Sequence, residues 1–333
     1  MSILVVGGAG YIGSHAVTIL VRQGHSVVVV DNLSTGHREA VHEKAMFYQG
    51  DLRDELFLKS VFDTESIDAV MHFAADSLVG VSMEQPLTYY DNNVGGANTL
   101  LKVMVEYGVK KIVFSSTAAT YGEPKSIPIL ENDTTLPTNP YGETKLAIER
   151  MLHWTKLAHE LNYVVLRYFN VAGADLEGTI GEDHNPETHL IPIVLQVASG
   201  QRQEIKIFGE DYPTPDGTCI RDYIHVQDLV NAHILALDYM NKTNQSGTFN
   251  LGNGNGYSVK EVIDVVAKVT GKEIPTVNSP RRAGDPAQLV ASSKKAQEEL
   301  GWKPQYASLE TMVSTAWRWA QLNPMGYRSK VKV

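Results

Sequence analysis

Cysteine is almost absent from this chain of 333 residues, in which Cys219 is the only example. A single cysteine excludes an intramolecular disulfide and gives no thiolate metal site, so we expect no bound metal. Its simplest interpretation is a buried or loop thiol rather than a nucleophile. The sequence also lacks a basic leader and any apolar run near the roughly 18–20 residues of a membrane span. These absences favour a reduced, soluble, cytoplasmic protein without membrane contact.

Basic tracts are lacking as well. The 29 lysines and arginines are outnumbered by 38 aspartates and glutamates, which gives a formal net charge of −9. This balance disfavours nucleic-acid binding as a main role, although a local basic pocket could still hold a phosphate. The composition of 43% hydrophobic and 20% charged residues is ordinary for a globular protein. Because the chain is longer than one core usually organises, we expect two domains or one enlarged α/β unit.

Short apolar runs alternate with longer amphipathic stretches up to about residue 170. The runs are rich in β-branched and aromatic residues and predict strands at Ile3–Val6, Ser26–Val30, Met46–Gln49, Ala69–Phe73, Lys111–Ser115 and Tyr163–Phe169. Helical patterns lie between them, as at His15–Gln23, Gly95–Tyr107 and Thr144–Leu161. Near-continuous apolarity suits strands covered on both faces. The alternation predicts an α/β fold with a doubly wound parallel sheet of the Rossmann type.

The pattern changes beyond Asn170, where polar, turn-rich sequence leads into shorter elements. We expect a strand at Glu204–Phe208 and helices at Ile193–Ser199, Val226–Met240, Val259–Thr270, Lys294–Leu300 and Leu309–Asn323. This half predicts a smaller C-terminal α/β lobe. We predict domains at about 1–175 and 176–333, and the chain can cross between them. Residues 328–333 form a basic tail of no evident function.

A glycine-rich turn, Gly7-Gly-Ala-Gly10-Tyr-Ile-Gly13, follows the first predicted strand directly and opens a helix. Its G-x-x-G-x-x-G spacing is one residue wider at the start than the G-x-G-x-x-G of many dehydrogenases. Glycines let the backbone approach a pyrophosphate, and the helix N-terminus offers amides and the positive end of a dipole. The position between first strand and first helix indicates a dinucleotide site rather than only a tight connection.

Two carboxylates refine the expected cofactor. Asp31 ends the second predicted strand, 18 residues after Gly13. A carboxylate there accepts hydrogen bonds from ribose hydroxyls and repels a 2′-phosphate, which favours NAD over NADP. A capping or turn aspartate is the alternative. Asp51 could hold the adenine amino group, or it could be a solvated turn residue.

Tyr141 and Lys145 lie four residues apart, which places them on the same face of a helix. An ammonium near a phenol favours the phenolate, so we expect the pKa of Tyr141 to be lowered. Such a base suits enzymes that move a hydride to or from an alcohol carbon. The spacing alone is weak evidence, but downstream of a nucleotide loop it predicts this chemistry.

These motifs, with the strand end Ser115-Ser-Thr117, resemble the extended short-chain dehydrogenase/reductase family and, more narrowly, the family of UDP-glucose 4-epimerases, which interconvert UDP-galactose and UDP-glucose. The similarity runs nearly end to end. It includes His72-Phe-Ala-Ala75, Tyr89-Tyr-Asp-Asn-Asn93, Arg167-Tyr-Phe-Asn170, Asp216-Gly-Thr-Cys-Ile-Arg-Asp-Tyr-Ile-His225, Arg281-Arg-Ala-Gly-Asp285 and Gly301-Trp-Lys-Pro304.

The resemblance implies roles for individual residues. Tyr141 would be the catalytic base, Lys145 would bind the nicotinamide ribose and lower the tyrosine pKa, and Thr117 would hydrogen-bond the sugar 4-hydroxyl. NAD would contact Gly7, Gly10, Tyr11, Ile12, Gly13, Asp31, Asn32, Asp51, Leu52, Phe73, Ala74, Ala75, Asn92, Ser115, Tyr141, Lys145 and Tyr168. Besides Thr117 and Tyr141, the UDP-sugar would contact Asn170, His189, Leu190, Phe208, Arg221, Arg282 and Asp285, with the arginines on the diphosphate.

The implied mechanism is transient oxidation at C4, rotation of the 4-keto sugar and return of the hydride from tightly bound NAD. The implied assembly is a homodimer through helices within Asn98–Tyr107 and Ala147–Leu157. Domain 1–175 would bind NAD, and 176–333 would mainly bind the nucleotide sugar.

Several alternatives stay open. Leu289, at the expected sugar pocket, is of intermediate size, so UDP-N-acetylhexosamines are alternative substrates, as are UDP-uronic acids. A 4,6-dehydratase would need an acidic residue beside the threonine, yet Ala118 follows Thr117. A non-catalytic NAD-binding regulator would be expected to lose Tyr141 and Lys145. Trp302 is interpreted as packing, and the histidines outside the motifs as ordinary surface or loop residues.

Overall fold

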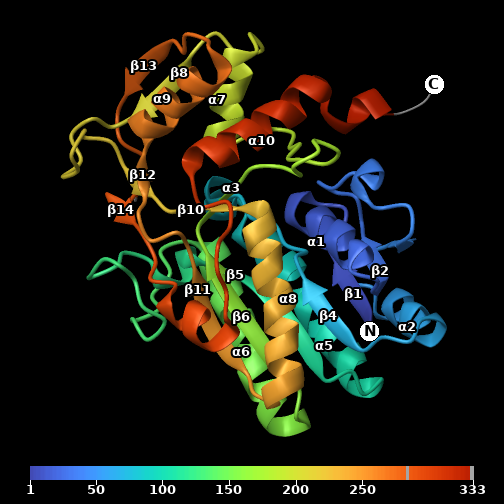
Figure 1. Cartoon of the computed structure of the whole chain (residues 1–333). Coiled ribbons are helices and arrows are strands. Elements are labelled where there is room, and N and C mark those ends of the chain that lie inside the picture. The colour runs from blue at the N-terminus through green and yellow to red at the C-terminus, as the bar shows by residue number, and fades with distance from the viewer. Residues whose placement is uncertain (283–284, 331–333) are drawn as a thin grey trace.

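The computed structural model describes residues 1–282 and 285–330. Its central feature is a seven-stranded sheet in the order β11-β6-β5-β4-β1-β2-β3, in which every pairing is parallel (Figure 1). The strands are β1 (Ser2–Val6), β2 (Ser26–Asp31), β3 (Met46–Gln49), β4 (Ala69–His72), β5 (Lys111–Thr117), β6 (Asn162–Tyr168) and β11 (Gly247–Leu251). The predicted doubly wound Rossmann-type sheet is confirmed, and all six strands expected in the first half are present.

Helices cover both faces of the sheet because successive strand residues point to opposite sides. Ile3 and Val5 pack with α1 (Tyr11–Arg22) and α8 (Val226–Thr243) in one apolar cluster. Leu4 and Val6 pack with helices on the other face, namely α2 (Glu55–Thr64), α5 (Gly96–Glu106) and α6 (Pro140–His159). Each fully buried Val, Leu or Ile side chain contributes about 1.5–3 kcal/mol to folding. The two layers hold the carboxyl edge of the sheet rigid.

The second lobe, at the top of Figure 1, has its own apolar cluster. Its helices are α7 (Leu190–Ala198), α9 (Val259–Thr270) and α10 (Leu309–Leu322). Its small sheets pair β8 (Ile205–Phe208) with β13 (Thr276–Ser279), β7 (Asn170–Ala172) with β10 (Tyr223–His225), and β9 (Ile220–Arg221) with β12 (Tyr257–Ser258) and β14 (Gln288–Leu289). The chain crosses between lobes after residue 175, because α8 and β11 belong to the layers of the central sheet.

The remaining elements are short. They are α3 (Val79–Glu84), α4 (Pro86–Tyr89), the 3₁₀ turns η1 (Arg38–Ala40), η3 (Ala118–Tyr121) and η5 (Gly326–Lys330), and the π turns η2 (Tyr90–Gly95) and η4 (Ala296–Leu300). The helix expected at Lys294–Leu300 is present: Lys294 and Lys295 are α-helical, and η4 continues them as a π-helix. Of the basic tail predicted at 328–333, residues 331–333 lie outside the described part of the chain.

Two expectations about single residues can be judged from burial. Trp302 is fully buried and donates its indole N–H to the Asp228 carbonyl, so its role in packing is confirmed. The expectation that histidines outside the motifs lie at the surface or in loops is wrong for His15 and His233. Both are buried on α1 and α8, and each ring bonds the backbone carbonyl one turn earlier, which satisfies a polar group inside an apolar layer.

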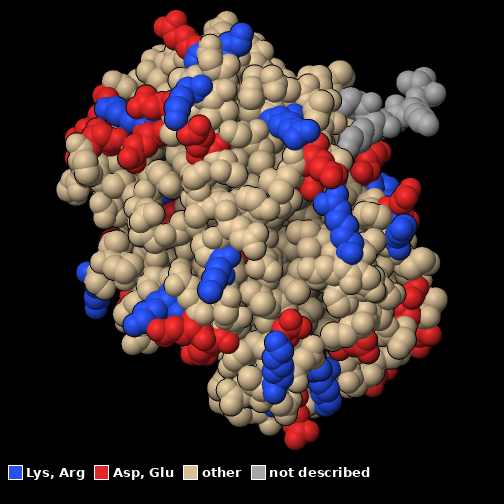
Figure 2. All heavy atoms as spheres, viewed as in Figure 1, with Lys and Arg blue, Asp and Glu red and all other residues tan. Residues whose placement is uncertain are grey.

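Charge is dispersed over the visible face of the molecule. Figure 2 shows lysine and arginine side chains scattered among acidic ones, without a continuous basic patch on that face. Within residues 1–282 and 285–330, no helix is long and apolar enough to cross a membrane.

Candidate active site

The glycine-rich turn joins β1 to α1 with backbone contacts that leave no room for a side chain at its first and third glycines. Gly7 has a φ of +76°, and a Cβ there would lie 2.5 Å from the Ala74 nitrogen. A Cβ on Gly13 would lie 2.1 Å from the Gly7 oxygen. Gly10 differs, since the nearest chain atom to its Cβ would be 3.5 Å away. The first and third glycines therefore hold the turn closed, while the middle one faces open space as a phosphate cradle requires.

A groove runs along the carboxyl ends of β1, β2 and β4, which meet at one edge because the strands are parallel. Many residues expected to bind the cofactor line it: Gly7, Gly10, Asp31, Asn32, Asp51, Leu52, Phe73, Ala74, Ala75 and Asn92. Tyr11, Ile12 and Gly13 begin α1 beside this groove. The residues present fit a dinucleotide, with glycines at one end and carboxylates at the other.

The two carboxylates have different surroundings. Asp31 is buried and accepts hydrogen bonds from the backbone N–H groups of Ala9 (2.9 Å) and Leu33 (2.8 Å), so it also fixes the glycine turn. Asp51 is paired with Arg53 at 2.8 Å and accepts a hydrogen bond from Asn32. The Arg53 guanidinium holds the pKa of Asp51 well below its usual range, although burial alone would raise it. A ligand amino group at Asp51 would share this carboxylate with Arg53.

Tyr141 and Lys145 lie in the first two turns of α6. That helix starts earlier than the expected Thr144 because Pro140 occupies its first position and the Asn139 side chain accepts a hydrogen bond from the Gly142 N–H. Lys145 is buried, and its Nζ donates to the Ser115 carbonyl at 2.9 Å. The same Nζ lies 6.0 Å from the centre of the Tyr141 ring. The two side chains therefore face the end of β5 together.

The expected lowering of the Tyr141 pKa is not found, and the reason is burial. Removal from water raises the pKa of Tyr141 to about 12, and the nearby Thr117 hydroxyl offsets only part of this rise. Burial likewise lowers the pKa of Lys145 to about 7, against the opposing effect of Glu149. Because the ammonium bonds Ser115 rather than the phenol, the chain's own groups leave Tyr141 protonated at neutral pH. A positive charge brought by a ligand would favour the phenolate.

The ends of β5 and β6 beside these residues bring three hydroxyl groups to the site, from Thr117, Ser115 and Tyr168. Thr117, the last residue of β5, interacts with the Tyr141 phenol and accepts a hydrogen bond from the Ala119 N–H at 3.1 Å. The Ser115 hydroxyl lies 2.9 Å from His233 Nε2. Tyr168, at the end of β6, interacts with the Ser115 side chain, and burial raises its pKa. Polar groups thus gather at the carboxyl ends of β5 and β6, next to the groove.

Four of the residues expected to hold the nucleotide sugar come together in the second lobe. Arg221 Nη2 pairs with Asp285 Oδ1 at 2.9 Å. The Arg282 guanidinium lies 4.0 Å from the centre of the Phe208 ring. Leu289, at the expected sugar pocket, is the β14 partner of Arg221 on β9. The charge of Arg221 is therefore neutralised by Asp285, and the Arg282 guanidinium lies over the Phe208 ring.

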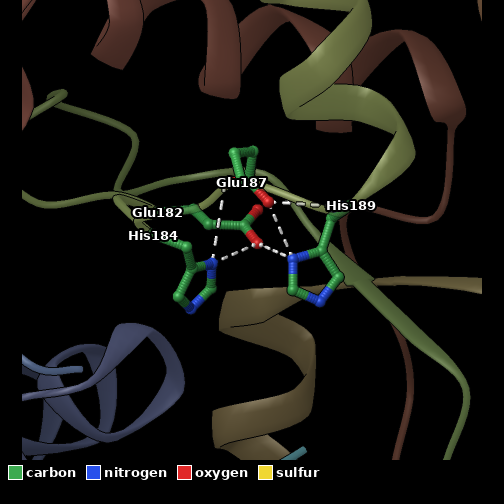
Figure 3. A group of neighbouring side chains, drawn as sticks. All are labelled: Glu182, His184, Glu187 and His189. Carbon is green, nitrogen blue, oxygen red and sulfur yellow. Dashed lines mark hydrogen bonds and ion pairs between the residues drawn. The ribbon is translucent and has the colours of Figure 1, made fainter. Parts of the chain in front are cut away.

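The other three are spread between the lobes. Asn170 begins β7, and its N–H donates to the Asp222 carbonyl at 3.1 Å. Leu190 begins α7. His189 directs Nδ1 toward Glu182 and Glu187, at 2.9 Å and 3.0 Å (Figure 3). Its Nδ1 is thus engaged within the chain, which leaves Nε2 for a ligand.

Sequence reasoning missed two partners of this site. His233, on α8, bonds the Ser115 side chain across 118 positions of sequence. Burial lowers the pKa of His233 to about 4, so the ring is neutral and its Nδ1 donates to the Leu229 carbonyl while Nε2 accepts from Ser115. The second partner is the buried pair formed by Arg167 and Glu149. No local sequence pattern predicts either contact. The only usable signal was that His233 lies in a helix that could be expected to be buried.

The fold and this site define a dinucleotide-binding α/β protein with the tyrosine, lysine and hydroxyl group of a short-chain dehydrogenase/reductase. Residues 3–252 match the family described as "NAD dependent epimerase/dehydratase family", and the chain belongs to that family.

Individual relatives agree over full length. The chain is 64% identical to a UDP-glucose 4-epimerase of Halalkalibacterium halodurans, covering 100% of this chain and 99% of that one. A solved crystal structure of a UDP-glucose 4-epimerase, also 64% identical, matches with a TM-score of 0.97 over 98% of this chain and 99% of that one. The Bifidobacterium longum UDP-glucose 4-epimerase in complex with NAD+ and UDP is 41% identical, with a TM-score of 0.93 over 98% and 100% of the two chains.

Proposed function

We propose that this protein is a UDP-glucose 4-epimerase that interconverts UDP-galactose and UDP-glucose with tightly bound NAD. The observation that carries the proposal is the meeting of Tyr141 and Thr117 at the carboxyl end of β5, on the same sheet edge as the glycine groove. Relatives at high identity over full length bear the same name.

The residues divide into those that hold ligands and those that move a proton. The groove residues would hold NAD, with Asp31 on the adenosine ribose and Lys145 on the nicotinamide ribose. Bound NAD supplies the acceptor and donor of the C4 hydride. Tyr141, as the phenolate that a positive charge on a bound ligand would favour, takes the proton of the 4-hydroxyl, and Thr117 hydrogen-bonds the same oxygen. On the return step Tyr141 gives the proton back.

Epimerisation also needs the sugar to turn while its carrier stays fixed. Guanidinium groups bind phosphate oxygens by two-point contacts, so Arg221 and Arg282 would hold the diphosphate firmly. Asp285 keeps Arg221 oriented through their ion pair. With the diphosphate held, the 4-keto sugar can rotate about its link to the diphosphate to present its other face.

The test is conversion of UDP-galactose by the purified chain without added cofactor. We expect UDP-glucose to form, because NAD is regenerated in every cycle. An NAD-binding regulator would form no product, and a dehydrogenase would stop after one turnover. UDP-N-acetylgalactosamine and UDP-glucuronate, assayed in parallel, decide between the hexose and the alternative substrates. Absence of turnover with every UDP-sugar would refute the proposal.

Substitution of Gly13 by alanine is expected to abolish cofactor retention. The new Cβ would lie 2.1 Å from the Gly7 oxygen, so the turn must open at the pyrophosphate end. NAD released from denatured protein, measured enzymatically, should fall from about one per chain to near zero. Gly80→Ala is the matched control, since no atom lies within 4 Å of a Cβ there. Equal NAD content in both variants would contradict this prediction.

A homodimer is also proposed, through the outer faces of α5 and α6. Its support is exposed apolar surface on α6, where Trp154 and Leu157 are 67% and 63% exposed. Light scattering should give twice the chain mass, and Trp154→Glu with Leu157→Glu should give the monomer mass. A monomeric wild type would overturn the proposal. The cytoplasmic location stays a prediction from the sequence.

A further inference from the structure

Two Glu-x-His units face each other in the loop between β7 and α7. They are Glu182-Asp-His184 and Glu187-Thr-His189. Figure 3 shows the two carboxylates between the two imidazole rings, with all four side chains converging on one point. One ligand atom from each residue lies within 4.8 Å of all the others. Neither unit takes part in the epimerisation steps described above. Only His189, through its Nε2, is expected to contact a ligand.

The spacing of these atoms is close to that of a coordination shell. Glu182 Oε1 lies 3.2 Å from His184 Nδ1 and 2.9 Å from His189 Nδ1. Glu187 approaches the same two nitrogens at 3.6 Å and 3.0 Å. Ligands held 2.0–2.2 Å from a tetrahedral ion are separated by about 3.3–3.6 Å. Three of the four nitrogen–oxygen separations are shorter than this range and the fourth is at its upper limit, so the side chains would have to move slightly apart to complete a tetrahedron.

A network of ion pairs is the competing explanation, and two details argue against it. Both imidazoles direct the same nitrogen, Nδ1, at the same oxygen, Glu182 Oε1, so these atoms converge on one point, while Glu187 meets the two rings with different oxygens. His184 Nδ1 is buried and makes no well-angled hydrogen bond within the part of the chain that the structure describes, despite its 3.2 Å approach to Glu182. Burial lowers the pKa of both imidazoles, but the two glutamates outweigh it and raise the pKa of His184 to about 9 and that of His189 to about 10, so a bound cation would displace a proton from each ring.

The outer surroundings also fit a metal site. The Glu182 and Glu187 side chains are only 8% and 4% exposed, so their charges are costly to bury without a cation. Glu187 Oε1 is fixed by the backbone N–H groups of Thr188 (2.8 Å) and His189 (2.9 Å). Metal ligands are commonly oriented by such second partners.

We propose that Glu182, His184, Glu187 and His189 bind one divalent transition-metal ion of the zinc class. Two imidazole nitrogens and two carboxylate oxygens form a donor set that suits Zn²⁺, whereas Mg²⁺ prefers octahedral oxygen shells. The lack of thiolates in the sequence predicted no bound metal. The Glu-x-His units lead to a different conclusion. It does not depend on the proposed epimerase activity.

The ion would fix the loop between β7 and α7, from which all four ligands come. The His184 ring lies 6.4 Å from the ring of Tyr11, which opens α1 directly after the glycine turn. His189 is the residue before α7 and precedes Leu190, a proposed contact of the nucleotide sugar. One bound ion would therefore hold this loop, which lies next to the start of α1 and directly precedes α7. His189 Nε2 points away from the cluster and stays available (Figure 3).

The test is metal binding by the full chain after treatment with a chelator. Titration with Zn²⁺ in competition with a chromogenic chelator should show one strong site per chain, and the same titration with Mg²⁺ should show none. Zn²⁺ should also raise the melting temperature. Glu187→Gln and His184→Asn should each weaken binding at least about 100-fold, the upper end of what loss of an outer-shell partner costs. His159→Asn, which alters an exposed histidine on α6, is the matched control and should bind like the wild type.

Each outcome of these titrations supports or overturns the proposed metal site. Failure of the wild type to bind Zn²⁺ more tightly than Mg²⁺ would establish the ion-pair network and overturn the proposal. Equal binding by wild type and both ligand variants would place the metal elsewhere and overturn it too. Circular dichroism of each variant, together with the wild-type titration, separates a lost ligand from a lost fold.

Discussion

Tyr141→Phe is expected to lower kcat by about 100- to 10,000-fold, the usual contribution of a positioned general base. The substitution removes only the hydroxyl that is proposed to take the 4-hydroxyl proton. The ring stays in its place in the first turn of α6, so Lys145 and Thr117 keep their positions at the end of β5. Because the lost interaction belongs to the proton transfer, kcat should fall much more than KM changes.

The measurement is initial conversion of UDP-galactose at saturating substrate, with NAD content determined on the same samples. Tyr239→Phe is a suitable control, since its hydroxyl donates to the side chain of Gln245 at 3.3 Å, near the C-terminal end of α8. The control should keep both activity and NAD. If Tyr141→Phe also keeps normal turnover, another group is the base and the assignment fails. If it loses NAD as well, the effect belongs to binding and not to proton transfer.

Structural features that depend on residues close together in the sequence were predictable. The glycine turn, Asp31 at the end of β2 and the helix that carries Tyr141 follow from local patterns, and the structure places them as those patterns indicate. The alternation of apolar runs predicted the parallel sheet. A parallel sheet in turn brings strand ends from distant sequence to one edge, which explains why the groove could be anticipated.

Features that depend on distant partners were not predictable. Arg221 meets Asp285 across 64 positions, and Ser115 meets His233 across 118. The pKa of Tyr141 failed as a prediction for a related reason, since spacing along a helix says nothing about how deeply the phenol is buried. The two Glu-x-His units are visible in the sequence. The prediction of no bound metal rested on the lack of thiolates alone and did not include imidazole and carboxylate ligands.

The last large effect concerns a buried ion pair behind the active site. Arg167, on β6, donates from Nε to Glu149 Oε1 at 3.0 Å and from Nη2 to the other oxygen of the same carboxylate. Arg167 also donates to the hydroxyl of Tyr121 at 2.9 Å, and Glu149 accepts from the Ser116 hydroxyl. Both charged side chains are 8% exposed. The pair therefore ties α6, one turn after Lys145, to the strands that end at the site.

Arg167→Met should lower the free energy of unfolding by about 3–5 kcal/mol, because it leaves the Glu149 carboxylate buried without its cation. Urea unfolding followed by fluorescence and circular dichroism, with coincident transitions, gives this value. Lys268→Met is the matched control: it breaks the exposed pair with Glu310 and should cost under about 1 kcal/mol. Adding Glu149→Leu to Arg167→Met should restore much of the loss, since an apolar pair needs no compensating charge. A loss for Arg167→Met no larger than the control's would show that this pair does not hold α6 to the sheet.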